Sequence, residues 1–310
     1  MDRDITWFLK RNKSIAYINH LYTQVVPDRE ADELEKWLDS EYEHPATLAI
    51  EKAVSNKKLS VGDWEKLIKF LASQDVRTPT RLYEHIQRFD KCVPEAINSA
   101  FENLKEKLIH KEFAHDQDPK KAGFRLPMKL NKETTPDGQG VILKIETYSG
   151  RSSWLNSIRY LLENTSKVLL EHKWTIVKPA KGFKWFTSDN PVVKLNFSTP
   201  KNYDLRGGWG QEKGNIFFPI SPEYALFVEI GNQPPQKYTR LSIEQTHFLR
   251  KIVAENANRM IFSDNVDSEI EKFLPRLVDM HKFRKEEKAF ENWHDRNKEL
   301  EIEYNKNKQE

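Results

Sequence analysis

The feature that most constrains this chain is a change of residue pattern near its middle. Between about residues 29 and 111, apolar residues recur at helical intervals among charged ones, which predicts helices. From residue 174 to 230 the apolar runs are short, β-branched and aromatic, and proline and glycine separate them, which is typical of strands joined by turns. The sequence therefore predicts an α+β protein with an N-terminal helical region, a mainly antiparallel sheet in the second half and C-terminal helices.

Turn and cap residues predict where individual elements end. Ser60 is expected to cap a helix that contains Trp64, and Thr78-Pro79 is expected to break it, because proline lacks a backbone donor and restricts the preceding residue. Ser242 and Gln245 have the spacing of a capping box at the start of a later helix. The expected strands are at 174–177, 184–187, 192–195, 216–219, 225–230 and 259–263.

Domain organisation follows from the same pattern. Residues 1–115 are expected to form a helical region. Prolines and glycines without a sustained period predict that residues 116–150 form a connection. Residues 151–265 are expected to form a helix and sheet region packed on the first region. Residues 266–310 are expected to form a C-terminal helix whose last residues fray.

The charge balance, the apolar runs and the cysteine content exclude several classes of protein. The chain has 50 Lys+Arg and 47 Asp+Glu, a net charge of +3, so any polyanion binding requires a local basic patch. There is no apolar run long enough for a membrane span and no secretory signal pattern, so a cytoplasmic location is expected. The single cysteine, Cys92, excludes an internal disulfide and has no ligand-spaced partner for zinc. The sequence leaves the cofactor and the partner undetermined, with nucleic acid or a nucleotide as the candidate partner and no membrane, and it assigns no metal site.

The turn Ser188-Asp189-Asn190-Pro191 lies between two apolar, strand-like runs. Its Asp and Asn side chains can bond nearby backbone amides, so the turn can be purely structural. Polar residues at strand ends also serve as acids, bases and ligand-binding groups. Asp189 is therefore a candidate general base or metal ligand, with Ser188, Asn190 and Lys194 as candidate substrate-binding residues. Both interpretations stay open.

A second polar group occurs where the helix before Thr78-Pro79 is expected to end. Gln74, Asp75 and Arg77 bring an amide, a carboxylate and a guanidinium to the point where the backbone changes direction. The planar guanidinium of Arg77 can bind a phosphate or carboxylate through two hydrogen bonds. Alternatively, it can pair with a neighbouring acidic side chain or with the carbonyl groups at the helix end. Gln74 and Arg77 are therefore candidate catalytic residues together with Asp189.

These stretches form part of an ordered set of motifs. The set comprises an acidic helix at 33–43, 59–60 with Asp63, 70–79, Trp174, 186–192, 218–222 and 256–263. In content and order it resembles the uncharacterised domain family numbered 4238, over roughly residues 20–265. That family usually opens with a His-His-Tyr-Val-Pro-Gln-type segment, which this chain does not show before Trp7. Either the start is truncated or the segment has been lost, so a catalytic role that depends on this histidine pair is not carried over from the resemblance. The resemblance implies no established activity.

Two further patterns are weaker indications of function. Arg81 and His85 are one helical turn apart, as in RNA-cleaving helical domains, but with three intervening residues where those domains commonly have four to six. The turn at 207–210, Gly-Gly-Trp-Gly, fits no phosphate-loop spacing and is expected to be a mobile turn that covers a site.

Two functional hypotheses remain. In the first, the protein is an enzyme acting on nucleic acid or a nucleotide, such as a nuclease in bacterial phage defence or a toxin effector. In the second, it is a non-catalytic binding or scaffold module in which Arg77 and Asp189 are buried structural polar groups. The position of Gln74, Arg77 and Asp189 relative to one solvent-accessible cleft distinguishes the two hypotheses.

Overall fold

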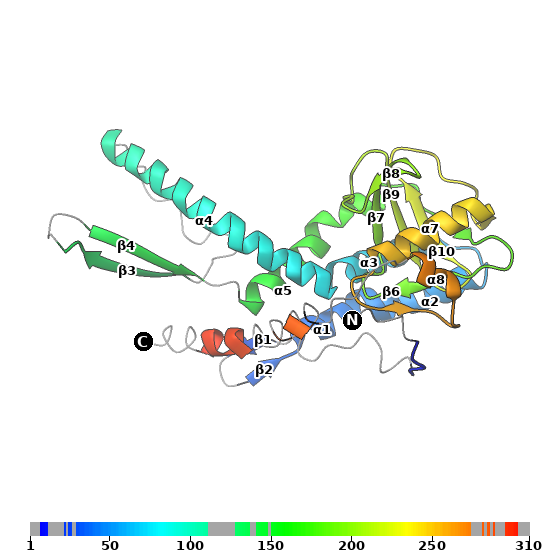
Figure 1. Cartoon of the computed structure of the whole chain (residues 1–310), viewed down its shortest axis with the longest axis horizontal. Coiled ribbons are helices and arrows are strands. Elements are labelled where there is room, and N and C mark those ends of the chain that lie inside the picture. Colours follow the sequence, from blue (N-terminus) through cyan, green and yellow to red (C-terminus); the bar gives the residue numbers. More distant parts are fainter. Residues whose placement is uncertain are drawn as a thin grey trace. The chain divides into compact units, whose positions relative to one another are not determined.

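The computed structural model describes residues 7–11, 22, 24–26, 29–110, 128–136, 141–147, 150–273, 281, 284–285, 288 and 295–302. Within these ranges the chain is α+β, with N-terminal helices, a mostly antiparallel sheet in the second half and helices toward the C-terminus, as predicted. The chain forms two compact units, one of residues 1–21, 33–81 and 158–288, the other of residues 22–32, 82–157 and 289–310. Figure 1 labels their elements. The segment before Trp7, residues 116–127 of the expected connection and the end expected to fray lie outside the described residues.

The first unit is built on a six-stranded sheet of order β11–β5–β10–β9–β7–β8. Neighbouring strands are antiparallel, except that β11 and β5 are parallel. A separate antiparallel pair joins β6 to β12. The strands are β5 (Thr175–Lys178), β6 (Thr187–Ser188), β7 (Val193–Thr199), β8 (Asn202–Asp204), β9 (Gly214–Pro219), β10 (Ala225–Glu229), β11 (Thr239–Arg240) and β12 (Ile261–Phe262). Each expected strand is represented, although the one expected at 184–187 is reduced to the short β6.

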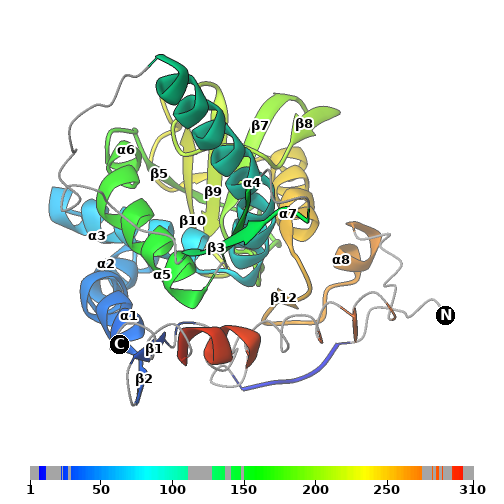
Figure 2. The same cartoon turned by 90° about the vertical axis from the view of Figure 1, so that its left-hand side faces the viewer.

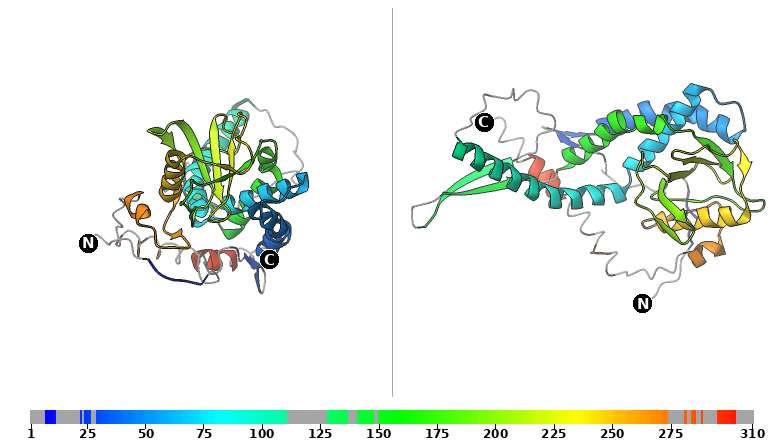
Figure 3. Two further views of the ribbon diagram at one scale, coloured as in Figure 1. Left: turned by 90° about the vertical axis from the view of Figure 1, so that its right-hand side faces the viewer. Right: turned by 90° about the horizontal axis from the view of Figure 1, so that it is seen from above.

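Helices cover both faces of this sheet. Val193 and Leu195 of β7 belong to a buried cluster with α7 (Ile243–Asn256). Lys194 lies between them, and because successive strand residues point to opposite faces, it points toward α3 (Val61–Val76). Figure 2 and Figure 3 show α3 and α7 on opposite sides of the strands. One residue of β7 thus brings a charged group into the layer between the sheet and α3.

Three helix boundaries in the first unit lie where the sequence predicts them. The helices α1 (Glu33–Leu38), a π-helical segment (Asp39–Glu43) and α2 (His44–Val54) follow one another without a break. Ser60 caps α3 in a capping box with Asp63, and α4 (Pro79–His110) begins at the predicted proline break. Later come a π-helical segment (Leu161–Thr165), α6 (Lys167–Leu170), the capping box of α7 at Ser242 and Gln245, and α8 (Ser268–Phe273).

Asp63, the capping carboxylate of α3, makes the folding stability of the protein depend on pH. Hydrogen bonds from Lys52 and from the backbone and hydroxyl of Ser60 hold the pKa of Asp63 below its usual range. Because the folded pKa is the lower one, this stabilisation is present above the unfolded pKa of about 4 and is lost as pH falls through the folded value. We expect Asp63→Asn to be less stable at neutral pH and to lose less stability below about pH 4, measured by urea unfolding across pH. Equal acid sensitivity in both proteins would contradict this.

The second unit contains most of α4 and a hairpin of β3 (Met128–Thr134) and β4 (Val141–Thr147). It also contains the short pair β1 (Gln24–Val26) and β2 (Arg29–Ala31), the start of α5 (Arg151–Tyr160) and a helix at 295–302. The hairpin pairs seven residues on each strand. It lies inside residues 116–150, which the sequence predicted to be a connection, so there the structure is more regular than expected. No helix in the described ranges is both long and apolar enough to span a membrane.

Candidate functional site

A buried polar cluster of the first unit surrounds the carboxylate of Asp75, which is 1% exposed. Its Oδ1 accepts hydrogen bonds from Nη2 (2.8 Å) and Nε (3.3 Å) of Arg81. Its Oδ2 accepts hydrogen bonds from Nζ of Lys194 (2.5 Å) and from the indole Nε1 of Trp209 (2.7 Å). One buried carboxylate therefore binds donors from α4, β7 and the 205–213 loop. We call these four residues the Asp75 cluster.

Local sequence explains how the two cations reach Asp75. The break at Thr78-Pro79 ends α3 and starts α4 within a few residues, so Arg81 in the first turn of α4 lies beside the last turn of α3. Lys194 reaches the same carboxylate because its strand directs alternate side chains to the α3 face. The cluster is therefore produced by one helix break and one strand register.

The Gly-Gly-Trp-Gly turn closes the cluster. The amide of Gly207 donates to the carbonyl of Lys194 at 3.2 Å, and a Cβ on Gly207 would lie 2.8 Å from the carbonyl carbon of Lys194. Nε2 of His172 donates to the carbonyl of Trp209 at 2.6 Å. These contacts hold the loop against β7 with Trp209 directed at Asp75. The turn at 207–210 thus places the indole of Trp209 on the carboxylate of Asp75.

The electrostatics of the cluster follow from burial. Loss of water raises the pKa of Asp75, while the guanidinium of Arg81 and the indole N–H of Trp209 oppose that rise. Two cations, Arg81 and Lys194, form ion pairs with the carboxylate of Asp75. Arg81 is 25% exposed and Trp209 is half-buried, so both also reach the surface. The solvent-facing side of the cluster is therefore cationic and aromatic.

The turn Ser188-Asp189-Asn190-Pro191 lies against the segment that follows α7. The carboxylate of Asp189 accepts the backbone N–H groups of Asn258 (2.9 Å) and Arg259 (2.8 Å). Nδ2 of Asn190 donates to the carbonyl of Asn256, and Nδ2 of Asn256 donates back to the carbonyl of Asn190. Burial raises the pKa of Asp189, and the backbone N–H groups oppose this. The turn is thus fixed by reciprocal bonds to a segment more than sixty residues away.

The hydroxyl of Ser188 completes that turn, because it donates to the carbonyl of Asn190 and accepts the Asn190 N–H. The three candidates Ser188, Asp189 and Asn190 therefore lie together. Lys194 binds Asp75 instead, and Arg77 forms an ion pair with Glu43. Gln74 precedes Asp75, and its Nε2 is buried without a partner in the part of the chain that the structure describes.

Asp75 and Trp209 were not among the site residues predicted from the sequence. Both appeared only as members of motifs, Asp75 beside Gln74 and Trp209 in the glycine-rich turn. Their meeting depends on a separation of 134 residues along the chain. The only local indication was the charge of Asp75 at the predicted end of a helix.

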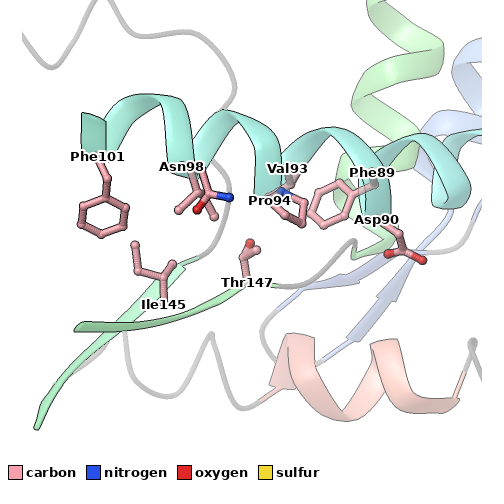
Figure 4. Close-up of a pocket in the computed structure, with 9 residues that line it drawn as sticks. Phe89, Asp90, Val93, Pro94, Asn98, Phe101, Ile145 and Thr147 are labelled. Carbon is pink, nitrogen blue, oxygen red and sulfur yellow. The ribbon is translucent and has the colours of Figure 1, made fainter. Parts of the chain in front are cut away.

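Hollows on the surface occur elsewhere. In the second unit a groove of about 660 Å³ runs between α4 and β4. Figure 4 shows Phe89, Val93 and Phe101 of the helix opposite Ile145 and Thr147 of the strand. In the first unit a hollow of about 390 Å³ lies beside β7 and β8. Across the described ranges, no three His, Cys, Asp or Glu side chains converge as metal ligands.

The two segments joined by Asp189, at 186–192 and 256–263, are both among the ordered motifs seen in the sequence. A family model described as "Protein of unknown function (DUF4238)" matches residues 3–267. The chain belongs to DUF4238. The DUF4238 region contains the Asp75 cluster and the Asp189 turn in full. No curated protein and no solved structure matches the chain.

Proposed function

We propose that the protein is an enzyme that acts on the phosphate groups of a nucleotide or nucleic acid at the Asp75 cluster. The observation that supports this proposal is the pair of cations, Arg81 and Lys194, held on one buried carboxylate beneath a half-buried tryptophan. Guanidinium and ammonium groups stabilise charge on a transferring phosphoryl group when they are fixed before the reaction. The cluster has that fixed arrangement.

Each residue has a distinct role in this proposal. Arg81 reaches the surface and binds phosphate oxygens, while Trp209 stacks on a base. Lys194, which is buried on β7, adds a second positive charge from the sheet side of the cluster. Asp75 is a positioning residue, because its four hydrogen bonds hold both cations and the indole in one orientation. Cleavage of RNA or DNA at this site would suit an effector of bacterial defence or a toxin.

A second candidate function is supported by the other predicted residues. Arg77 is paired with Glu43, and the Asp189 carboxylate bonds the backbone of Asn258 and Arg259. Both contacts stabilise the fold and require no catalytic role for Arg77 or Asp189. They favour a non-catalytic binding or scaffold module, in which the Asp75 cluster is also a structural polar group.

A matched pair of arginine substitutions separates the candidates. Arg81 and Arg77 are four residues apart, their side chains are 25% and 24% exposed, and each forms an ion pair with an acidic side chain, Asp75 and Glu43 respectively. We expect Arg81→Gln to lower cleavage or hydrolysis at least about 100-fold, because a fixed charge that stabilises the transition state is lost. Arg77→Gln is expected to retain activity. The measurements are turnover of nucleoside triphosphates, RNA and DNA by purified protein, and growth of expressing bacteria.

The other outcomes are equally informative. Activity that depends on Arg77 rather than Arg81 would move the site to the residue first selected from the sequence. Wild-type protein without turnover of any of these substrates, and without effect on growth or on cellular RNA and DNA, would favour the scaffold candidate. Thermal unfolding of each variant shows whether a lost activity reflects lost structure.

A further inference from the structure

The second unit contains a buried ion pair at the start of α5. Arg151 and Glu301 are 2% and 4% exposed. Oε1 of Glu301 accepts the backbone N–H of Arg151 at 3.1 Å, and Oε2 lies 3.4 Å from Nε of Arg151. The carboxylate of the C-terminal helix at 295–302 is therefore held at the N-terminus of another helix, beside a buried guanidinium.

This location favours an anion for two independent reasons. The N-terminus of a ten-residue helix such as α5 presents backbone N–H groups and the positive end of the helix dipole. The guanidinium of Arg151 adds a full charge that is almost completely removed from water. A single carboxylate does not use all of these donors, because Nη2 of Arg151 is buried and has no hydrogen-bond partner among the residues that the structure describes.

The number of oxygens on the bound anion decides how many donors of Arg151 it can satisfy. The two oxygens of Glu301 face the backbone N–H and Nε of Arg151. A phosphate group has additional oxygens, and arginine binds phosphate through two parallel N–H donors. A phosphate in this place would engage Nη2 as well as Nε. The unpartnered donor therefore fits a phosphate better than it fits the carboxylate that is present.

The α4–β4 groove begins close to this point. His85 of α4 lies 3.1 Å from the hydroxyl of Ser153 in the first turn of α5. Phe89, which lines the groove, is one helical turn further along α4, or about 6 Å. Thr147, on the opposite wall in Figure 4, precedes Arg151 by four residues. An organic phosphate bound at Arg151 would thus have apolar and aromatic side chains within reach of its body.

We propose that Arg151 and the N-terminus of α5 form a binding site for an organic phosphate, which Glu301 occupies in the present structure. The ligand is a phosphate monoester with an apolar or aromatic body that lies in the α4–β4 groove. Its binding requires that the carboxylate of Glu301 leave. This site is separate from the Asp75 cluster, and it does not depend on the function proposed for that cluster.

Glu301→Gln tests the proposal, with Glu299→Gln as the matched control. Glu299 is on the same helix and exposed, so its substitution changes the net charge equally and leaves Arg151 paired. Inorganic phosphate and phenyl phosphate are titrated into the full chain, and affinity and thermal midpoint are measured. We expect Glu301→Gln to bind phenyl phosphate at least about tenfold more tightly than wild type or Glu299→Gln, since an internal competitor is removed. Arg151→Met in the Glu301→Gln background should remove the gain.

Several results would overturn the assignment. Equal phosphate affinity of Glu301→Gln and Glu299→Gln would show that the pair is only a structural contact. Inorganic phosphate binding as tightly as phenyl phosphate would remove the groove from the site. Should Glu301→Gln be too unstable to titrate, Glu301→Asp retains the charge with a shorter reach. Phenyl phosphate is then expected to raise its thermal midpoint more than that of wild type, and no difference would contradict the proposal.

Discussion

Asp75→Ala is expected to lower the free energy of unfolding by about 3–5 kcal/mol, the cost of leaving buried charge without its partner. The substitution removes the acceptor of Lys194, which is 9% exposed, and of the Trp209 indole. It also removes a carboxylate acceptor of Arg81. The measurement is urea unfolding at neutral pH. A loss below about 1 kcal/mol, typical of an exposed ion pair, would contradict the role given to Asp75.

The double variant Asp75→Ala with Lys194→Met separates the pair from the rest of the cluster. When both charges are absent, the desolvation cost of the lone ammonium disappears, so the double variant is expected to be more stable than Asp75→Ala alone. A double-mutant cycle gives the coupling energy. Coupling close to zero would mean that Lys194 does not depend on Asp75.

Asp189→Ala is expected to lower the free energy of unfolding by about 2–3 kcal/mol, because two backbone N–H groups lose a charged acceptor. The burial of Asp189 limits the access of water to the vacated place. Urea unfolding measures the loss. The expected mechanism is release of the segment after α7 from the turn, rather than loss of a catalytic group.

Asp204→Ala is the control for this prediction. Asp204 is exposed and also accepts a backbone N–H, that of Arg206, at 2.8 Å. Because water replaces its acceptor oxygens, a loss of no more than about 1 kcal/mol is expected. If Asp189→Ala were as stable as the wild type but lost an observed activity, Asp189 would be a catalytic residue rather than a structural one.

The sequence predicted those parts of the fold that depend on neighbouring residues. The caps at Ser60 and Ser242 and the break at Thr78-Pro79 lie as expected because each depends on side chains within three or four positions. The hairpin of β3 and β4 was missed. Its strands have polar residues at several positions, and proline and glycine lie nearby, so neither periodicity nor composition marked them.

The candidate site was predicted in part. Lys194 and the stretch around Gln74 were selected, and the structure brings Lys194 to Asp75. The stretch containing Asp189 was also selected, and it forms a different contact with Asn258 and Arg259. The polar residues were recognisable by type, whereas their grouping into two separate sets was not.

The sequence by itself determined the fold class, the main helix ends and the family of this protein, because hydrophobic period, caps and ordered motifs are local properties of the chain. Only the tertiary structure decided which polar residues meet. Asp75 lies 119 residues from Lys194, and Asp189 lies 69 residues from Asn258. Such pairs form when strand register and helix packing bring distant segments together, and no local pattern encodes which charge will face which.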